Sequence, residues 1–198
     1  MPRVTSSRSD MVRTMARLLR RQGYSATGWR QVVAESGAPW GSQAHHFPGG
    51  KQQLAAEAVA ASGSSYERML RAALEGSGPS EAIRAWAELA ADHLESTNWL
   101  EGCPIATVAL EQGAVSEPVG GACGRVLKSW QAVITSSLEE HGLGTEQAGN
   151  LATLVLAGIE GALLLSKALQ DHAPLTTVGV ELASVIAARI EEARSPSS

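Results

Sequence analysis

The sequence has few aromatic residues, almost no cysteine and few stretches that favour a β-strand. Its 198 residues include one Phe, two Tyr and two Cys. The cysteines, Cys103 and Cys123, are too few for a disulfide framework and lack the spacing of a metal site. Strand-like alternation is rare, whereas Ala, Leu and Glu dominate. The chain is therefore predicted to be all-α.

Long apolar runs are also missing, and the first residues lack the pattern of a signal peptide. No uninterrupted apolar run reaches the roughly 18 residues of a membrane span. No apolar stretch follows the first arginines, as it would in a signal peptide. With 44% hydrophobic residues, the chain can still bury a sizeable core. We therefore expect a cytoplasmic protein that has no membrane partner.

Acidic residues are scarce in only one part of the chain, its N-terminal quarter. Residues 1–51 hold eight Lys or Arg and two acidic residues, a net charge of +6. The remainder holds eight basic and 18 acidic residues, a net charge of −10. A basic end on an acidic body favours a polyanionic partner for the N-terminal segment alone. A chance fluctuation on a solvated surface is the alternative.

Apolar residues recur at helical spacing along the whole chain, and glycine and proline mark the ends of about nine helices. Gly23 and Gly37 are predicted to end the first and second helices, with Thr27 as the N-cap of the second. Pro39 is predicted to open a short third helix, because its missing N–H costs nothing in a first turn. The remaining helices are expected over about 51–74, 80–97, 104–112, 117–140, 145–171 and 174–193.

The stretch GAPWGSQAHHFPGGK, from Gly37 to Lys51, could be a metal site, a phosphate-binding loop or part of a DNA reader. His45 and His46 are adjacent, so on a helix their side chains point about 100° apart. No Cys, Asp or Glu lies within the stretch to complete a metal shell. FPGGKQQ lacks the P-loop pattern, and no strand precedes it. We therefore expect neither a metal nor a nucleotide here.

Two helices joined by a tight turn at residues 37–38 predict a helix-turn-helix. Its second helix would present N-terminal residues to base edges, while nearby basic residues contact phosphates. Gln43 could bond adenine, Trp40 could pack on thymine methyl groups, and Lys51, at a helix start, could bind phosphate. Phe47 is predicted to lie in the core. The predicted DNA-contacting residues are Thr27, Arg30, Trp40, Ser42, Gln43, His45, His46 and Lys51.

The stretch RRQGYSATGWRQVVAESGAP, with GSQAHHF and the lysine that follow it, resembles the DNA-binding region of the TetR/AcrR family of bacterial repressors. FPGGKQQLAAEAV and GCPIATVALE are similar to the LmrA-type branch of that family. The likeness is specific over residues 8–58 and looser to about residue 192. The residues in register are Gly23, Tyr24, Thr27, Val32, Ser36, Gly37, Gly41, His45, His46, Phe47 and Lys51.

This resemblance implies an all-helical homodimer whose N-terminal three-helix domain, residues 1–52, binds palindromic operator DNA. Residues 53–198 would form a ligand-binding and dimerisation domain, and a small-molecule inducer would release the operator. The two reading helices would lie roughly 34–36 Å apart. Ala44 stands where the family usually has Tyr. Trp40 and Gln43 replace residues that are usually basic and apolar, so we expect an unusual operator.

Residues that could line a ligand pocket occur in the C-terminal part. Trp86 and His93 share a predicted helical face with residues 89, 90, 94 and 97, and Glu111 lies on the GCPIATVALE helix. Tryptophan on such a face is usually core. A pocket for a small hydrophobic or aromatic inducer, however, needs aromatic walls and a few polar groups. The predicted pocket residues are Trp86, His93, Trp99, Cys103, Thr107, Glu111 and Trp130.

Cys103 has a second possible role, because it precedes Pro104 at a predicted helix start, where a thiolate is favoured. A redox pair with Cys123 is conceivable on that basis. Buried structural cysteine is the commoner case.

The penultimate helix is apolar nearly all round, which indicates burial on more than one side. Gly158 and Gly161 would let a neighbouring helix approach closely. Together with the last helix, it is predicted to form a four-helix contact between two copies of the chain. Burial within one chain is the alternative. The predicted interface residues are Leu154, Gly158, Gly161, Leu165, Leu182, Val185 and Ile186.

Two other classes of protein are alternatives to a repressor. An enzyme would need a nucleophile beside a base, paired Glu-x-x-His helices or a cofactor fingerprint, and the sequence offers none of these. We therefore expect no enzyme activity and no cofactor. A helical ligand-binding or interaction protein with weakened or lost DNA binding is the remaining alternative, which Ala44 and Trp40 keep open.

Overall fold

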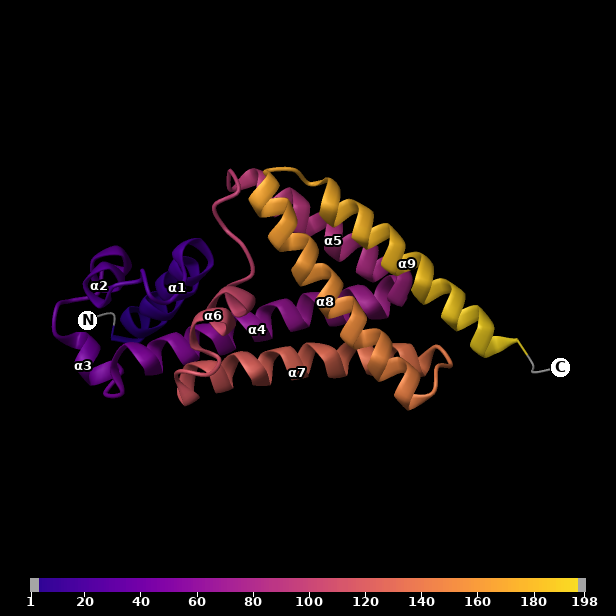
Figure 1. Cartoon of the computed structure of the whole chain (residues 1–198). Coiled ribbons are helices and arrows are strands. Elements are labelled where there is room, and N and C mark those ends of the chain that lie inside the picture. The colour runs from indigo at the N-terminus through magenta and orange to yellow at the C-terminus, as the bar shows by residue number, and fades with distance from the viewer. Residues whose placement is uncertain (1–3, 196–198) are drawn as a thin grey trace. The chain divides into compact units, whose positions relative to one another are not determined.

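Nine α-helices are the only regular elements in residues 4–195, which are the residues described by this computed structural model (Figure 1). This architecture confirms the predicted all-α fold and the number of helices. The helices are α1 (Val4–Gln22), α2 (Trp29–Ser36), α3 (Ser42–His46), α4 (Gly50–Ser77), α5 (Pro79–Ser96), α6 (Pro104–Gln112), α7 (Glu117–Glu140), α8 (Thr145–Leu169) and α9 (Ala173–Arg194).

The contacts divide the chain into two compact units. The first comprises Met1–Ser65 and Cys103–Leu127, and the second comprises Tyr66–Gly102 and Lys128–Ser198. The short helix α6 therefore belongs to the same unit as the three N-terminal helices. The boundary expected after residue 52 separates two functions, DNA binding and ligand binding, and not two sets of contacts. It stays a prediction. Arg3, which was counted in the basic segment, lies outside the described residues.

The predicted ends of three helices need correction. Thr27 does not cap α2, because Gly28 is the N-cap and the buried Thr27 hydroxyl donates to the Gly23 carbonyl at 2.6 Å. The third helix begins at Ser42 rather than Pro39, because Gly41 has a φ of +102°, outside the helical region. The Pro39 carbonyl instead accepts a turn hydrogen bond from the Ser42 N–H. The fourth helix is longer than expected at both ends.

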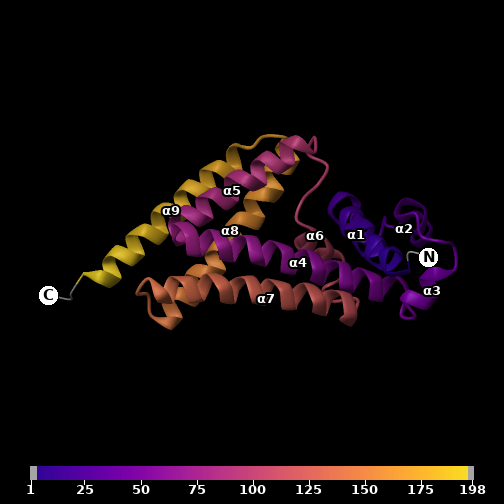
Figure 2. The ribbon, with the colours of Figure 1, turned by 180° about the vertical axis from the view of Figure 1, so that it is seen from behind.

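In the second unit, α5, α8 and α9 pack together, as both views show (Figure 2). The buried face of α5 carries the small residues Ala82, Ala87 and Ala91 together with the larger Ile83 and Leu94. Opposite it, a Cβ added to Gly179 of α9 would lie 2.5 Å from the Ala87 Cβ. The two backbones therefore approach closely, and glycine is required at this crossing.

Aromatic side chains support one part of this core. The Trp130 side chain is buried and meets Trp86 edge to face at a centroid distance of 6.1 Å. Tyr66 meets Trp130 on another side at 6.0 Å. Edge-to-face contacts of this kind add stability beyond the buried area.

Two helices, α8 and α9, are long and apolar enough to cross a membrane by length and composition alone. A search for uninterrupted apolar runs does not find these two helices, because small and polar residues are spread through both of them. Core helices of soluble proteins pass the same test. Only 33% of the tested α8 window and 28% of the α9 window is buried in the chain, so both helices keep apolar surface for a contact outside it.

Candidate nucleic-acid interface

The two helices of the predicted DNA reader are joined by a turn that glycine makes possible. α2 ends at Ser36, and Gly37 follows with a φ of +66°, its N–H bonded to the Ala34 carbonyl. Val32 and Val33 of α2 are buried and fix this helix on the rest of the unit. The turn therefore directs the chain into α3 in the manner of a helix-turn-helix.

Phe47 anchors α3 to the unit. Its side chain is 1% exposed, as predicted for a core residue. The Trp29 ring meets it edge to face at 6.5 Å, and the Arg8 guanidinium lies 5.0 Å from its ring centroid. α3 itself has no buried residue among its five. The helix is thus held from its end and leaves its side chains accessible.

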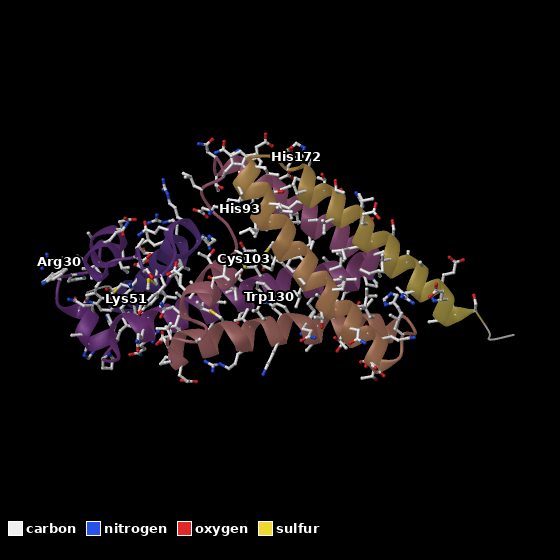
Figure 3. The ribbon with its side chains drawn as sticks, viewed as in Figure 1. Arg30, Lys51, His93, Cys103, Trp130 and His172 are labelled. Atoms are coloured by element: carbon white, nitrogen blue, oxygen red, sulfur yellow. The ribbon has the colours of Figure 1, made fainter. Side chains whose placement is uncertain are left out.

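Several predicted DNA contacts lie on the accessible surface of the first unit. Arg30, Trp40 and His45 are exposed, with Trp40 66% exposed, and His46 and Ser42 are partly exposed. Figure 3 shows the Arg30 side chain extending away from its helix. These positions suit contact with a duplex, and their role in DNA binding stays a prediction.

Other predicted contacts are already engaged within the chain. The Gln43 side-chain oxygen accepts the Gly41 N–H at 2.6 Å, so a bidentate bond to adenine would require its release. Lys51 Nζ donates to the Tyr24 carbonyl at 2.7 Å, and it lies 4.0 Å from the Tyr24 ring centroid. An ammonium has three donors, so Lys51 retains N–H groups for phosphate. The buried Thr27 is less suited to this role.

Ion pairs neutralise part of the positive charge of the first unit. Arg8 pairs with Glu57, and Arg17 pairs with Glu35, both at 2.6 Å. The hydrogen bond from Arg17, followed by that from Gln31, lowers the pKa of Glu35. The exposed Arg30 is not among these pairs, so it is a strong candidate for a phosphate contact.

A hollow of about 340 Å³ opens beside α3. Ala44 forms part of its wall, at the position where the family usually has Tyr. Trp29 also lines it, although it was not predicted as a site residue. Its place at the start of α2 was the signal available in the sequence, and only the structure shows its contact with Phe47. The lining residues are Trp29, Gln43, Ala44, Phe47, Pro48, Gly50 and Lys51.

The predicted ligand-pocket residues are divided between the two units, and their role in ligand binding stays a prediction. Trp86, His93, Trp99 and Trp130 belong to the second unit, whereas Cys103, Thr107 and Glu111 belong to the first. Trp86 and Trp130 do touch, and Trp99 packs partly buried against the small core around Leu94. Figure 3 labels His93, Cys103 and Trp130.

Two of the predicted ligand-pocket residues, His93 and Glu111, have surroundings that differ from those expected. His93 does not face inward, because its side chain is 43% exposed and lies 3.5 Å from Glu101. The buried face of α5 is rotated toward its alanines, which leaves His93 outside. The Glu111 carboxylate accepts a hydrogen bond from the Ser25 N–H. Sequence reasoning could not find this partner, which lies 86 positions away.

The two cysteines have different environments, and these environments do not favour a redox pair. Cys103 is the N-cap of α6, and its Sγ accepts the Ala106 N–H at 3.4 Å. Burial raises the pKa of Cys123 to about 11, so this thiol stays protonated and unreactive. Within residues 4–195, no group of three or more metal-ligating side chains occurs.

The predicted dimer residues fall into two groups. Leu154, Gly161 and Leu165 of α8 and Val185 of α9 are exposed and available to a partner. The others serve the chain itself. Leu182 and Ile186 are buried, and a Cβ on Gly158 would lie 3.1 Å from Leu182. Exposed apolar residues that were not predicted extend the first group: Leu164, Leu169 and Val180.

Comparison with known proteins agrees with this architecture. Residues 79–181 match the family model described as the C-terminal domain of LmrA/YxaF-like transcriptional regulators. The HTH-type transcriptional regulator YxaF of Bacillus subtilis is 40% identical over 177 residues, covering 89% of this chain and 93% of the relative. The HTH-type regulator LmrA of the same species is 36% identical over 170 residues, covering 85% and 90%.

A solved structure shows the same fold. A TetR-family regulator from Agrobacterium tumefaciens superimposes with a TM-score of 0.80 at 23% identity. The match covers 92% of this chain and 98% of that one. The residues that carry the resemblance thus lie in a complete fold of this type.

Proposed function

Because this chain belongs to the TetR family of transcriptional regulators, in its LmrA/YxaF-like branch, we propose that it is a dimeric repressor that binds a palindromic operator and is released by a small-molecule inducer. It is a regulator and not an enzyme. The proposal concerns the operator, the dimer and the inducer.

The observation that carries the DNA-binding part is the exposed α3, held at its end by the buried Phe47. A short helix that buries no residue of its own has no role in the core, yet its position is fixed. Arg30 of α2 and His45 of α3 itself are exposed and can supply phosphate contacts. This combination suits a helix that enters a major groove.

The proposal is tested by selecting duplexes from a random pool with the purified chain. We expect a palindromic site and an affinity that falls steeply with salt, because phosphate contacts release counterions. An Arg30→Ala, His45→Ala double variant should lose about tenfold or more in affinity and bind with a shallower salt slope. If the wild type selects no duplex, the alternative of a helical interaction protein is favoured.

The inducer part rests on the aromatic group of the second unit. Trp86 is partly exposed and contacts Trp130, which in turn contacts Tyr66. Aromatic walls of this kind suit a small hydrophobic or aromatic molecule. Compounds that release the selected duplex should quench tryptophan fluorescence, and Trp86→Ala should weaken both effects. Release that is unaffected by this change would place the inducer elsewhere.

Restoring the family's usual tyrosine provides a gain-of-function prediction. An Ala44→Tyr variant should bind the selected duplex about fivefold more tightly, because its hydroxyl adds a phosphate contact of about 1 kcal/mol. The hollow beside Ala44 gives the ring room. Ala44→Phe is the matched control, since it adds the ring without the hydroxyl. Equal gains for both variants would contradict a phosphate contact. Fluorescence anisotropy measures both affinities.

A further inference from the structure

One peptide group in the turn between α1 and α2 is held at both ends by opposite charges. Its carbonyl, from Tyr24, accepts a hydrogen bond from Lys51 Nζ at 2.7 Å. Its N–H, from Ser25, donates to Glu111 Oε2 at 2.6 Å. The ammonium and the carboxylate thus bind the negative and positive ends of the peptide dipole. Both are charge-assisted hydrogen bonds, which are stronger than neutral ones.

The approach of Glu111 depends on the glycine before this peptide group. A Cβ added to Gly23 would lie 2.0 Å from Glu111 Oε1. Gly23 also has a φ of +77°, which disfavours other residues. Thr107, one helical turn before Glu111, lies on the same side, with its Cγ2 3.5 Å from that Cβ position. α6 therefore lies directly against the turn.

The charge of Glu111 also acts on Lys51. Partial burial lowers the pKa of Lys51, and the negative charge of Glu111 opposes that effect. Lys51 lies in the first turn of α4 and Glu111 lies in the last turn of α6. The peptide group between Tyr24 and Ser25 thus links α4 and α6, two helices that are not neighbours in the sequence.

Hydrogen bonds brace the turn internally and connect it to α2. The Thr27 hydroxyl donates to the Gly23 carbonyl, and the Gln22 amide donates to the Ala26 carbonyl and to Gln31 of α2. α2 begins only a few residues after Ser25 and leads through a tight turn into α3. A displacement of the turn therefore moves α2 and α3 with it.

We propose that Glu111 is a positioning residue, which together with Lys51 holds the Tyr24–Ser25 peptide group and so fixes α2 and α3 against α4 and α6. This role deepens the proposed function, because the placement of α3 matters for reading DNA. It also gives α6 a direct connection to the DNA reader within the first unit.

The first test needs no DNA. Hydrogen exchange of the Ser25 amide is measured in the wild type, Glu111→Ala, Glu111→Gln and Glu140→Gln, whose site is the exposed last residue of α7. In Glu111→Ala the amide should exchange about tenfold faster, because its charged acceptor is lost. Glu111→Gln keeps an acceptor oxygen and should lie between, and Glu140→Gln should match the wild type.

The second test measures affinity for the selected duplex at several salt concentrations. Glu111→Ala should bind about fivefold more weakly with an unchanged salt slope, because Glu111 touches no phosphate. Glu111→Gln should recover most of the loss. A phosphate contact, by contrast, changes the slope when it is removed.

The outcomes separate this inference from the proposed function. Unchanged Ser25 exchange in Glu111→Ala overturns the positioning role, whatever the DNA results. Faster exchange with undiminished affinity also overturns it, because the turn would then not control α3. If the wild type selects no duplex, the proposed function fails, and the exchange data alone decide whether Glu111 holds the turn.

Discussion

Replacing Phe47 by alanine is expected to lower the free energy of unfolding of the first unit by about 3–5 kcal/mol and to abolish duplex binding. Phe47 is the single phenylalanine of the chain and is 1% exposed. Its ring contacts Trp29 of α2 and lies near Arg8 of α1. Its loss removes apolar burial and the edge-to-face contact, and it leaves a cavity.

The effect on function follows from the small size of α3. A helix of five residues has too few internal hydrogen bonds to persist by itself. Without Phe47 it is expected to fray, so that Gln43 and His45 lose their fixed positions. Duplex affinity should then fall by about 100-fold or more, in line with the loss of fixed base and phosphate contacts.

Urea unfolding followed by circular dichroism, with hydrogen exchange to assign the unit that unfolds, measures the stability change. Phe47→Leu is the matched control and should lose less than about 1.5 kcal/mol, with most duplex binding retained. Wild-type stability in Phe47→Ala would show that this side chain does not hold α3.

Replacing Leu165 by glutamate is expected to convert the proposed dimer to a monomer. Leu165 is 51% exposed on α8, so the change should leave the fold of the single chain intact. In an apolar interface, however, a carboxylate without a partner costs several kcal/mol. The exposed apolar residues of α8 and α9 would then face water.

Loss of the dimer should also weaken operator binding by about 100-fold or more. A dimer engages two half-sites, and the second contact benefits from a high effective concentration. A monomer has one half-site and loses that gain. The effect on DNA thus arises from a helix of the second unit, without any change in the side chains of α3.

Light scattering after size exclusion measures the oligomeric state, and anisotropy measures the affinity. Leu89→Glu is the matched control, because Leu89 is similarly exposed but lies on α5. It should remain dimeric. A dimeric Leu165→Glu, or a monomeric wild type, would refute the proposed interface.

The alternative explanation for the apolar helices is burial within the chain, and the structure supports it for only part of the predicted set. Leu182 and Ile186 are buried, so α9 does serve the chain's own core. Leu154 and Leu165 remain exposed on α8. The spacing of apolar residues indicates that a helix is apolar on several sides, but it does not show which side packs against which neighbour.

The buried face of α5 is not the face on which its larger residues predict burial. His93 and Leu89 were assigned to an inward face with Trp86, yet both are exposed. The buried face carries Ala87 and Ala91, because α9 approaches closely at Gly179. Small residues at such a crossing give a weak periodic signal, although they determine how near two backbones can come.

The sequence alone determined the helices, the turn at Gly37 and the core position of Phe47. These features follow from neighbouring residues: the helical period, the freedom of glycine at positive φ and the cost of exposing an aromatic ring. Only the tertiary structure decided the partners of Lys51 and Glu111. Both are polar side chains whose hydrogen-bond partner is a backbone group of a remote turn, and every peptide group offers the same donor and acceptor. Which peptide group they meet therefore depends on how the helices pack.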